Sequence, residues 1–243
     1  MSKFGLIGKN IDYSFSKKYF SEKFERENLP HSYENFDIYS IADFQNIISK
    51  TPHLKGLNVT IPYKEEIIPL LDNLDEDARK IGAVNTIKIS DDKKLTGYNT
   101  DHFGFQKSLE AFLPLQHKTA LILGTGGASK AVAYALEKLG FQFQFVSRKE
   151  SLNTLQYSSL NQTTIENHLL LINCTPVGTF PNIADCPPIL YQFLTENHLL
   201  FDLIYNPSET KFLNQGKAKG AKTTNGLKML EMQADKAWEI WNS

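Results

Sequence analysis

The chain has 243 residues, of which 26 are Lys or Arg and 27 are Asp or Glu, so its formal net charge at pH 7 is −1. This balance lacks the basic excess that marks nucleic-acid-binding proteins, and we expect no nucleic-acid partner. No apolar run approaches the roughly 18 residues that a membrane span needs, and the first apolar run is too short for a signal peptide. Cys174 and Cys186 form no C-x-x-C pair. We therefore expect no membrane partner and a reducing, cytoplasmic location.

The first hundred residues alternate apolar, extended stretches with helix-like ones. Pro62 suits a first helical position, which favours a helix directly after it, and residues 91–94 read as a hairpin turn. After a polar turn at 8–16, the predicted helices cover 17–27, 41–49, 63–71 and 74–81. The predicted strands cover 4–7, 33–38, 57–61, 83–89 and 95–98.

The remainder of the chain repeats the alternation. Its predicted strands cover 121–123, 141–146, 169–173 and 199–203, with a further short strand reaching Thr223, and its predicted helices cover 127–139 and 226–241. The polar stretch 149–168 predicts one abbreviated crossover. Alternation of this kind predicts an α/β protein with mostly parallel sheets. The last helix carries a wide apolar stripe that must pack on something.

A glycine turn stands between the apolar strand 119–123 and an Ala-rich helix. Gly124-Thr125-Gly126-Gly127 departs from the usual G-x-G-x-x-G because Ser129 fills the third small position. A buried strand, a glycine turn and a helix N-terminus together hold a dinucleotide pyrophosphate. Arg148 ends the next strand, and a guanidinium there can bind a 2′-phosphate in bidentate fashion, which favours NADP over NAD. The alternative is an exposed turn with solvated charges.

Three polar residues allow either a structural or a chemical role. Asp101 directly precedes a predicted helix and can be its N-cap, worth ~1 kcal/mol. Lys64 falls in the first predicted turn after Pro62, where the helix dipole disfavours a cation. This position hints at a chemical role, and the alternative is a solvated lysine. Asn85 lies inside an apolar strand, and a buried amide needs partners. It is a member of a structural network or a ligand contact. The histidines show no metal-binding spacing, and we expect no metal.

Seven blocks of the sequence, in order, resemble the NADP-dependent shikimate dehydrogenase family. They cover nearly the whole chain. The blocks are Asn58 to Lys64, Gly82 to Thr86, Gly97 to Asp101 with Gly104-Phe105, Gly124 to Ser129, Asn173 to Gly178, Asp202 to Pro207 followed by Thr210, and Gly226 to Leu230 with Gln233-Ala234.

The resemblance implies two domains. Residues 1–100 with 226–243 would form a mixed, mostly parallel α/β substrate-binding domain, and residues 101–225 a Rossmann-like NADP-binding domain. The last helix would pack back on the first domain. The implied activity is the reversible reduction of 3-dehydroshikimate to shikimate by NADPH, in the pathway to the aromatic amino acids.

The resemblance also implies a role for each site residue. Lys64 and Asp101 would be the catalytic pair. The substrate would contact Ser14 and Ser16 through its carboxylate, and Thr60, Asn85, Gln233 and Tyr205 elsewhere. The cofactor site would contain Gly124, Gly126, Gly127, Ala128, Ser147, Arg148, Thr175 and Gly226.

The chain departs from the family at two places. Lys17-Lys18-Tyr19-Phe20 stands where the family has Pro and then His-Asn, and Ser147-Arg148-Lys149 replaces Asn-Arg-Thr.

Three other functions are possible for this sequence. They are an NAD-dependent quinate/shikimate dehydrogenase, a folate-linked methylene dehydrogenase, which the serine pair and Gln233 disfavour, and an inactive nucleotide-binding sensor. Either a monomer or a homodimer fits the sequence.

Overall fold

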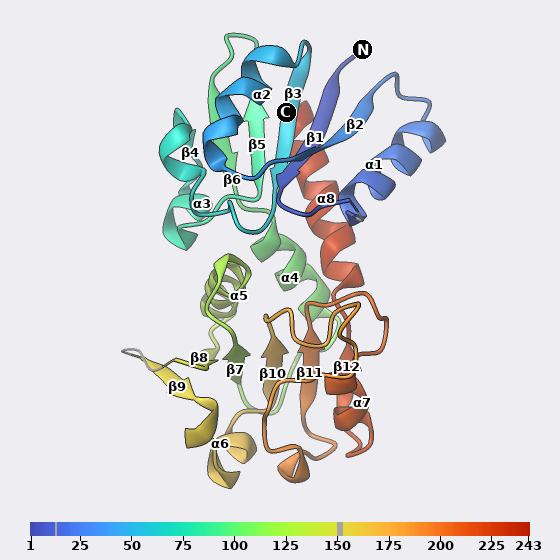
Figure 1. The fold of residues 1–243 in the computed structure, drawn as a ribbon. Helices are drawn as coiled ribbons and strands as arrows, with labels where there is room; N and C mark the ends of the chain where they lie inside the picture. Colours follow the sequence, from blue (N-terminus) through green and yellow to red (C-terminus); the bar gives the residue numbers. More distant parts are fainter. Residues whose placement is uncertain (13, 150–152) are drawn as a thin grey trace. The chain divides into compact units, whose positions relative to one another are not determined.

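The computed structural model of the protein describes residues 1–12, 14–149 and 153–243 (Figure 1). The chain divides into two compact units, residues 1–103 with 230–243, and residues 104–229. The divisions between the units fall inside two helices, α4 (Asp101–Glu110) and α8 (Leu227–Asn242). Each helix therefore contributes side chains to both units.

The N-terminal unit is built on a six-stranded mixed sheet of order β2-β1-β3-β5-β6-β4. β1 is parallel to β2 and β3, and β4 is parallel to β6, while β5 is antiparallel to β3 and β6. The predicted hairpin at 91–94 is confirmed as the β5–β6 connection. The strands are β1 (Lys3–Gly8), β2 (Ser32–Asp37), β3 (Leu54–Val59), β4 (Asn73–Leu74), β5 (Thr86–Ile89) and β6 (Leu95–Tyr98).

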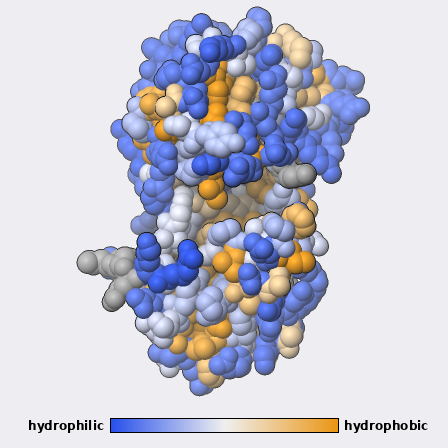
Figure 2. All heavy atoms as spheres, viewed as in Figure 1, coloured by the Kyte–Doolittle hydropathy of each residue, from blue (hydrophilic) through white to orange (hydrophobic). Residues whose placement is uncertain are grey.

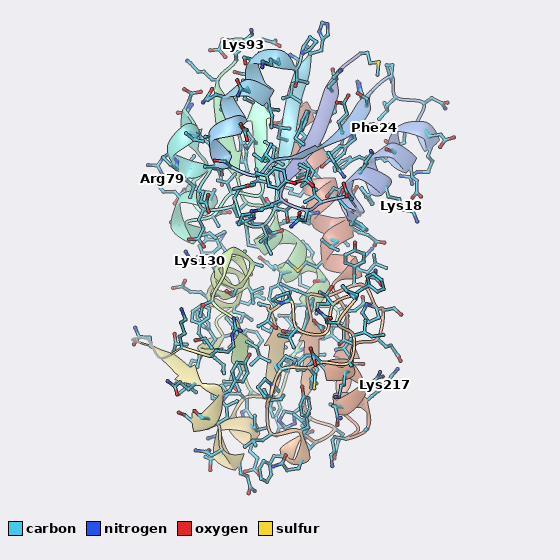
Figure 3. The ribbon with its side chains drawn as sticks, viewed as in Figure 1. Lys18, Phe24, Arg79, Lys93, Lys130 and Lys217 are labelled. Atoms are coloured by element: carbon cyan, nitrogen blue, oxygen red, sulfur yellow. The ribbon has the colours of Figure 1, made fainter. Side chains whose placement is uncertain are left out.

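Helices cover both faces of this sheet, because successive side chains of a strand point to opposite faces. Phe4 and Leu6 of β1 belong to the cluster that includes side chains of α1 and α8, whereas Ile7 belongs to the cluster around α2 and α3. In Figure 3, Phe24 and Lys18 both project from α1; Phe24 is buried and Lys18 is exposed. The helices are α1 (Phe15–Arg26), η1 (Ile41–Asp43), α2 (Phe44–Lys50), η2 (Ile68–Leu70) and α3 (Glu76–Ile81).

The C-terminal helix α8 packs against the first sheet, which confirms that prediction. Ala234, Ala237 and Trp241 are buried with Phe4 and Phe20. The indole Nε1 of Trp241 donates a hydrogen bond to the carbonyl of Ile87 over 3.0 Å. Gly56 makes this approach possible, because a Cβ there would lie 2.3 Å from the same nitrogen.

The predicted helix at 63–71 is wrong. Residues 61–67 form successive turns, and only the 3₁₀ helix η2 follows. The carbonyl of Lys64 accepts a hydrogen bond from Val84 N over 2.7 Å, and Ile68 N donates to Glu65 instead. The backbone of Lys64 is thus committed to a distant segment, which breaks the i→i+4 pattern that a helix needs. Because no helix begins at Lys64, its charge does not oppose a helix dipole, contrary to the expectation from the sequence.

The C-terminal unit is built on a six-stranded parallel sheet of order β12-β11-β10-β7-β8-β9. Its central strands are almost wholly buried, as expected for a parallel sheet covered on both faces. The strands are β7 (Thr119–Leu123), β8 (Gln142–Ser147), β9 (Thr154–Gln156), β10 (Leu170–Asn173), β11 (Leu199–Asp202) and β12 (Lys222–Thr224).

Alternate residues of β7 face the two helical layers. Ala120 and Ile122 pack with side chains of α4 and α5, and Leu121 and Leu123 pack with those of α6 and α7. Hydrophilic residues cover most of the visible face of each unit (Figure 2). The helices are α5 (Gly127–Lys138), η3 (Tyr157–Ser159), α6 (Gln162–Asn167), η4 (Tyr191–Phe193) and α7 (Lys211–Lys217).

The stretch 149–168 holds more structure than the abbreviated crossover that its polarity predicted. It contains the edge strand β9, then η3 and α6, while residues 150–152 lie outside the described ranges. β9 has only three residues, each half-buried, so its apolar signal is too weak to identify from sequence. Across the described ranges, no helix is both long enough and apolar enough to cross a membrane.

Candidate active site

An ion pair joins the end of β3 to the start of α4 in the N-terminal unit. The Nζ of Lys64 lies 2.7 Å from Oδ2 of Asp101, and their side chains are only 15% and 8% exposed. Lys64 lies in the turns after β3, and Asp101 is the first residue of α4. A pair this well shielded interacts more strongly than a surface ion pair and has little contact with solvent.

The carboxylate of Asp101 is held by side chains. Its Oδ1 accepts a hydrogen bond from Asn85 Nδ2 over 2.8 Å, on the opposite oxygen from Lys64. The backbone N–H of His102 donates to Asn99 Oδ1 over 3.3 Å, so Asn99 serves the first turn of α4 as a cap. Lys64 and Asn85 thus each bind one oxygen of the Asp101 carboxylate and fix its orientation. The helix N-terminus also favours its negative charge.

Asn85 is the centre of a buried polar network and is 2% exposed. Its Oδ1 accepts from Thr100 N over 2.6 Å and from Thr86 Oγ1 over 3.1 Å. Its Nδ2 lies within hydrogen-bond distance of three acceptors, on Thr100, Asp101 and Gln233. Both ends of the amide are therefore satisfied, which fixes its orientation.

Gln233 reaches this network from α8. Its Oε1 lies 3.3 Å from both Asn85 Nδ2 and Thr100 Oγ1, and its Nε2 donates to Leu230 O over 3.0 Å. Gln233 lies at the edge of the apolar stripe of α8. Because this stripe packs on the sheet, it brings Gln233 within hydrogen-bond distance of Asn85.

Three residues of the network were not assigned to the site from the sequence. Asn58 donates from Nδ2 to Asn85 O and Thr86 Oγ1 over 3.3 and 3.2 Å, and Thr86 Oγ1 lies 3.3 Å from Thr100 Oγ1. All three are buried. The available signal was a polar side chain inside an apolar strand for Asn58 and Thr86, and proximity to Asp101 for Thr100.

The serine pair lies at the start of α1. Ser14 is the N-cap, accepting from Lys17 N over 3.2 Å and donating to Asn35 Oδ1 over 3.0 Å. Ser16 lies within the first turn of α1, so the predicted polar turn at 8–16 extended too far. The helix begins earlier than predicted because the cap supplies an acceptor for its first free N–H groups.

The other two predicted substrate residues differ in position. Thr60 follows β3, and its backbone N–H donates to Ile7 O over 2.9 Å, while its hydroxyl makes no hydrogen bond among those described for residues 1–12, 14–149 and 153–243. Tyr205 belongs to the C-terminal unit, after β11, and partial burial raises the pKa of its phenol.

The glycine turn of the C-terminal unit joins β7 to α5. Gly124 has a φ of 111°, which disfavours any side chain. Gly126, the N-cap of α5, has an ordinary φ of −82°, and a Cβ there would meet no described heavy atom within 4 Å. The backbone conformation therefore requires a glycine at Gly124, and the space beside Gly126 is open to the approach of a ligand. Gly127 and Ala128 form the first turn of α5, where backbone N–H groups favour an anion.

A basic segment follows β8, the strand next to β7. Ser147 ends the strand, and its hydroxyl accepts from Lys149 N over 3.1 Å. Arg148 lies between them and is exposed. An exposed guanidinium beside the glycine-turn strand can bind a phosphate.

Two further predicted cofactor residues lie in loops held by buried hydrogen bonds. Thr175 donates from its N and Oγ1 to Asn173 Oδ1 over 3.0 and 2.6 Å, and Asn173 donates from Nδ2 to Asp202 over 3.0 Å. Gly226 donates from its N to Ile204 O over 3.1 Å, and a Cβ there would lie 2.1 Å from Leu203 O. Gly226 thus has a packing reason of its own to be glycine.

Known proteins are similar to this chain in both sequence and fold. The model of a family described as the shikimate dehydrogenase substrate binding domain matches residues 6–87. A protein of Clostridium botulinum named shikimate dehydrogenase (NADP(+)) is 39% identical over 248 residues, covering 98% of this chain and 95% of its own.

Two solved structures superpose closely. Shikimate 5-dehydrogenase of Thermus thermophilus, in complex with NADP(H) and shikimate, is 31% identical with a TM-score of 0.88, over 99% of this chain and 93% of that one. Quinate dehydrogenase of Corynebacterium glutamicum, in complex with NAD, is 28% identical with a TM-score of 0.87, again over 99% and 93%.

Proposed function

This chain belongs to the shikimate dehydrogenase family, and on that premise we propose that it interconverts 3-dehydroshikimate and shikimate with NADPH and NADP+. It is an oxidoreductase that acts on a CH–OH group, and its product belongs to the pathway to the aromatic amino acids. The observation that carries the proposal is the shielded pair of Lys64 and Asp101, 2.7 Å apart and held by Asn85.

The catalytic pair meets the needs of carbonyl reduction. When bound, NADPH supplies the hydride to the ring carbonyl. Lys64 holds protons at Nζ, beside which a developing alkoxide would be stabilised and protonated. Asp101 orients the ammonium through Oδ2 and can accept a hydrogen bond from a substrate hydroxyl. The reverse reaction uses the same pair to remove the hydroxyl proton as shikimate is oxidised.

The polar residues assigned to the substrate suit a hydroxylated carboxylic acid. Ser14 and Ser16 offer hydroxyl groups for the carboxylate. Thr60, Gln233 and Tyr205 offer polar groups for the ring oxygens, and Asn85 contacts the ring or orients Asp101. The hydroxyl of Thr60 supports this role, because it makes no hydrogen bond within the part of the chain that the structure describes and is available to a ligand.

The cofactor residues fit a dinucleotide with a 2′-phosphate. Gly126 is open where the backbone must come close to a pyrophosphate, and Gly127 and Ala128 present N–H groups beside it. Ser147 and Arg148 follow the adjacent strand and suit the 2′-phosphate, with Thr175 and Gly226 on neighbouring loops. We accordingly assign residues 101–225 to NADP binding and residues 1–100 with 226–243 to substrate binding.

A second candidate is a quinate/shikimate dehydrogenase that uses NAD, which the likeness to a quinate dehydrogenase in complex with NAD supports. Arg148 favours the NADP enzyme, because NAD has no 2′-phosphate. The test is nicotinamide absorbance with shikimate or quinate, each with NADP+ or NAD+. Rapid reduction of NADP+ by shikimate alone supports the first candidate, and activity mainly with quinate or NAD+ supports the second. Cofactor binding without turnover would indicate an inactive sensor.

We also propose a cytoplasmic location, which the two free cysteines support, and either a monomer or a homodimer in solution.

A further inference from the structure

Tyr33 lies at the edge of the buried polar network of the N-terminal unit and bonds to it through Asn58. It belongs to β2 and is 5% exposed, and β2 is the strand that lies beside α1 (Figure 1). Its phenol donates a hydrogen bond to Asn58 Oδ1 over 2.7 Å. Burial raises the pKa of that phenol well above its ordinary value. The phenol thus stays protonated and remains a hydrogen-bond donor to Asn58.

The hydrogen bonds continue from Asn58 to the catalytic pair. Because Oδ1 of Asn58 faces Tyr33, its Nδ2 faces Asn85 O and Thr86 Oγ1. Thr86 Oγ1 donates to Asn85 Oδ1 over 3.1 Å, and Asn85 Nδ2 donates to Asp101. One continuous path therefore runs from Tyr33 through Asn58, Thr86 and Asn85 to Asp101.

The ring of Tyr33 is held as firmly as its hydroxyl. It stacks on Phe20 of α1 with centroids 4.8 Å apart and planes 12° apart, and it also contacts Trp241 of α8. Two helices and two strands thus fix one oxygen atom. A phenol oxygen on a rigid ring sets the orientation of an amide more firmly than a flexible side chain can, because little rotamer freedom remains to be lost.

We propose that Tyr33 is a positioning residue for the reaction: it fixes the Asn58 amide, and through Thr86 and Asn85 it holds Asp101 in place. The proposal rests on the proposed function for its kinetic consequences. Tyr33 itself contacts neither member of the catalytic pair. Its hydroxyl acts on Asp101 through the side chains of Asn58, Thr86 and Asn85.

The test variant is Tyr33→Phe, which deletes one oxygen and keeps the packed ring. We expect kcat/KM for shikimate to fall about tenfold, through a higher KM and a lower kcat, because the Asn58 oxygen is left buried without its donor. The Kd for NADP+, measured without shikimate, stays at the wild-type value, since the proposed cofactor residues lie in the C-terminal unit.

Tyr63→Phe is the matched control. Tyr63 is also buried in the N-terminal unit, and its phenol donates to the backbone carbonyl of Ile38 over the same 2.7 Å, outside the network. We expect the two variants to lose similar thermal stability, and only Tyr33→Phe to change the shikimate KM and kcat. Equal kinetic losses in both would reduce the role of Tyr33 to general stability and overturn the proposal.

Hydrogen exchange of the Asn58 and Asn85 side-chain amides, followed by NMR, reports the network without turnover. We expect faster exchange in Tyr33→Phe and wild-type exchange in Tyr63→Phe. If the wild-type protein oxidises shikimate and Tyr33→Phe keeps its KM and kcat, the positioning role is overturned. If the wild-type protein does not oxidise shikimate, the proposed function fails separately. Unchanged amide exchange in Tyr33→Phe then overturns the positioning role, and faster exchange supports it.

Discussion

The Nζ of Lys64 lies 2.7 Å from Oδ2 of Asp101, although 37 residues separate them in the chain. The mixed sheet causes this approach. β3 ends just before the Lys64 turns and β6 ends just before Asp101, and both lie next to the start of β5. The segment entering β5 bonds to both neighbours, because Val84 N donates to Lys64 O and Asn85 N donates to Tyr98 O. The antiparallel pairing of β5 thus assembles the pair.

Replacing Lys64 tests its place in the mechanism. We expect Lys64→Ala to lower kcat by about 10²- to 10⁴-fold, because a general acid and a cation beside the oxyanion are both removed. The shikimate KM should stay within about tenfold of wild type, since this interaction strengthens in the transition state. Steady-state kinetics by NADPH absorbance give both values. Lys80→Ala, an exposed lysine paired with Glu76 on α3, is the control. A near-normal kcat in Lys64→Ala removes Lys64 from the mechanism.

Replacing Arg148 tests cofactor choice. We expect Arg148→Gln to raise the KM for NADP+ by about 10- to 100-fold, the value of a charge-assisted contact to the 2′-phosphate. The KM for NAD+ should stay unchanged, because NAD+ lacks that group. Lys149→Gln, at the adjacent exposed lysine, is the matched comparison. A larger effect at Lys149 than at Arg148 would show that Lys149 makes the phosphate contact and would contradict the assignment to Arg148.

The two glycines Gly126 and Gly226 should respond differently to an added methyl group. Gly126→Ala meets no described atom within 4 Å, so we expect a loss of only about 1 kcal/mol in stability, from the poorer N-cap, and a clear loss of NADP+ affinity. Gly226→Ala places its Cβ 2.1 Å from Leu203 O, so we expect a lower Tm. Thermal unfolding and NADP+ titration measure the two effects. Unchanged NADP+ affinity in a folded Gly126→Ala would exclude close contact at that glycine.

Asp202 should make the stability of the C-terminal unit depend on pH. It is fully buried, and burial raises the pKa of its carboxyl from 3.8 to about 6, although hydrogen bonds from Thr210, Ile204 and Asn173 oppose the rise. The folded state then binds the proton more tightly than the unfolded state. Its contribution to stability is therefore present below about pH 4 and is lost as pH rises through about 6, by on the order of 2 to 3 kcal/mol.

Asp202→Asn removes this titration. Urea unfolding measures the free energy of unfolding at pH 4.5 and at pH 7. We expect the value at pH 7, relative to that at pH 4.5, to be higher in the variant than in wild type, because the variant lacks the loss caused by ionisation of Asp202. Other carboxyl groups titrate in the same window, so the comparison is between the two pH differences. Asp185→Asn, at an exposed aspartate, should leave the wild-type difference unchanged. The same pH difference in Asp202→Asn and wild type would contradict the assignment.

Much of the fold could be predicted because its signals are local. The glycine turn follows an apolar strand and precedes a helix, and β7 and α5 are confirmed around it. The apolar stripe of α8 predicted that the helix packs, and the family resemblance predicted correctly that it packs on the first sheet. The predictions that failed depended on distant partners. Residues 63–71 have a helical pattern, yet the bond from Val84 to Lys64 prevents a helix.

The sequence by itself determined the alternation of strands and helices, the glycine turn, and the family, which the full-length relatives confirm. Apolar periodicity, turn chemistry and motif order are written in neighbouring residues, where short-range sterics and burial decide them. Only the tertiary structure decided which polar groups meet. Asn85 and Gln233 are 148 residues apart in the chain, yet Asn85 Nδ2 lies 3.3 Å from Gln233 Oε1. Such contacts depend on the order of the strands in the sheet and on the side to which α8 returns, because a buried polar group takes whichever partner the packed backbone brings within reach.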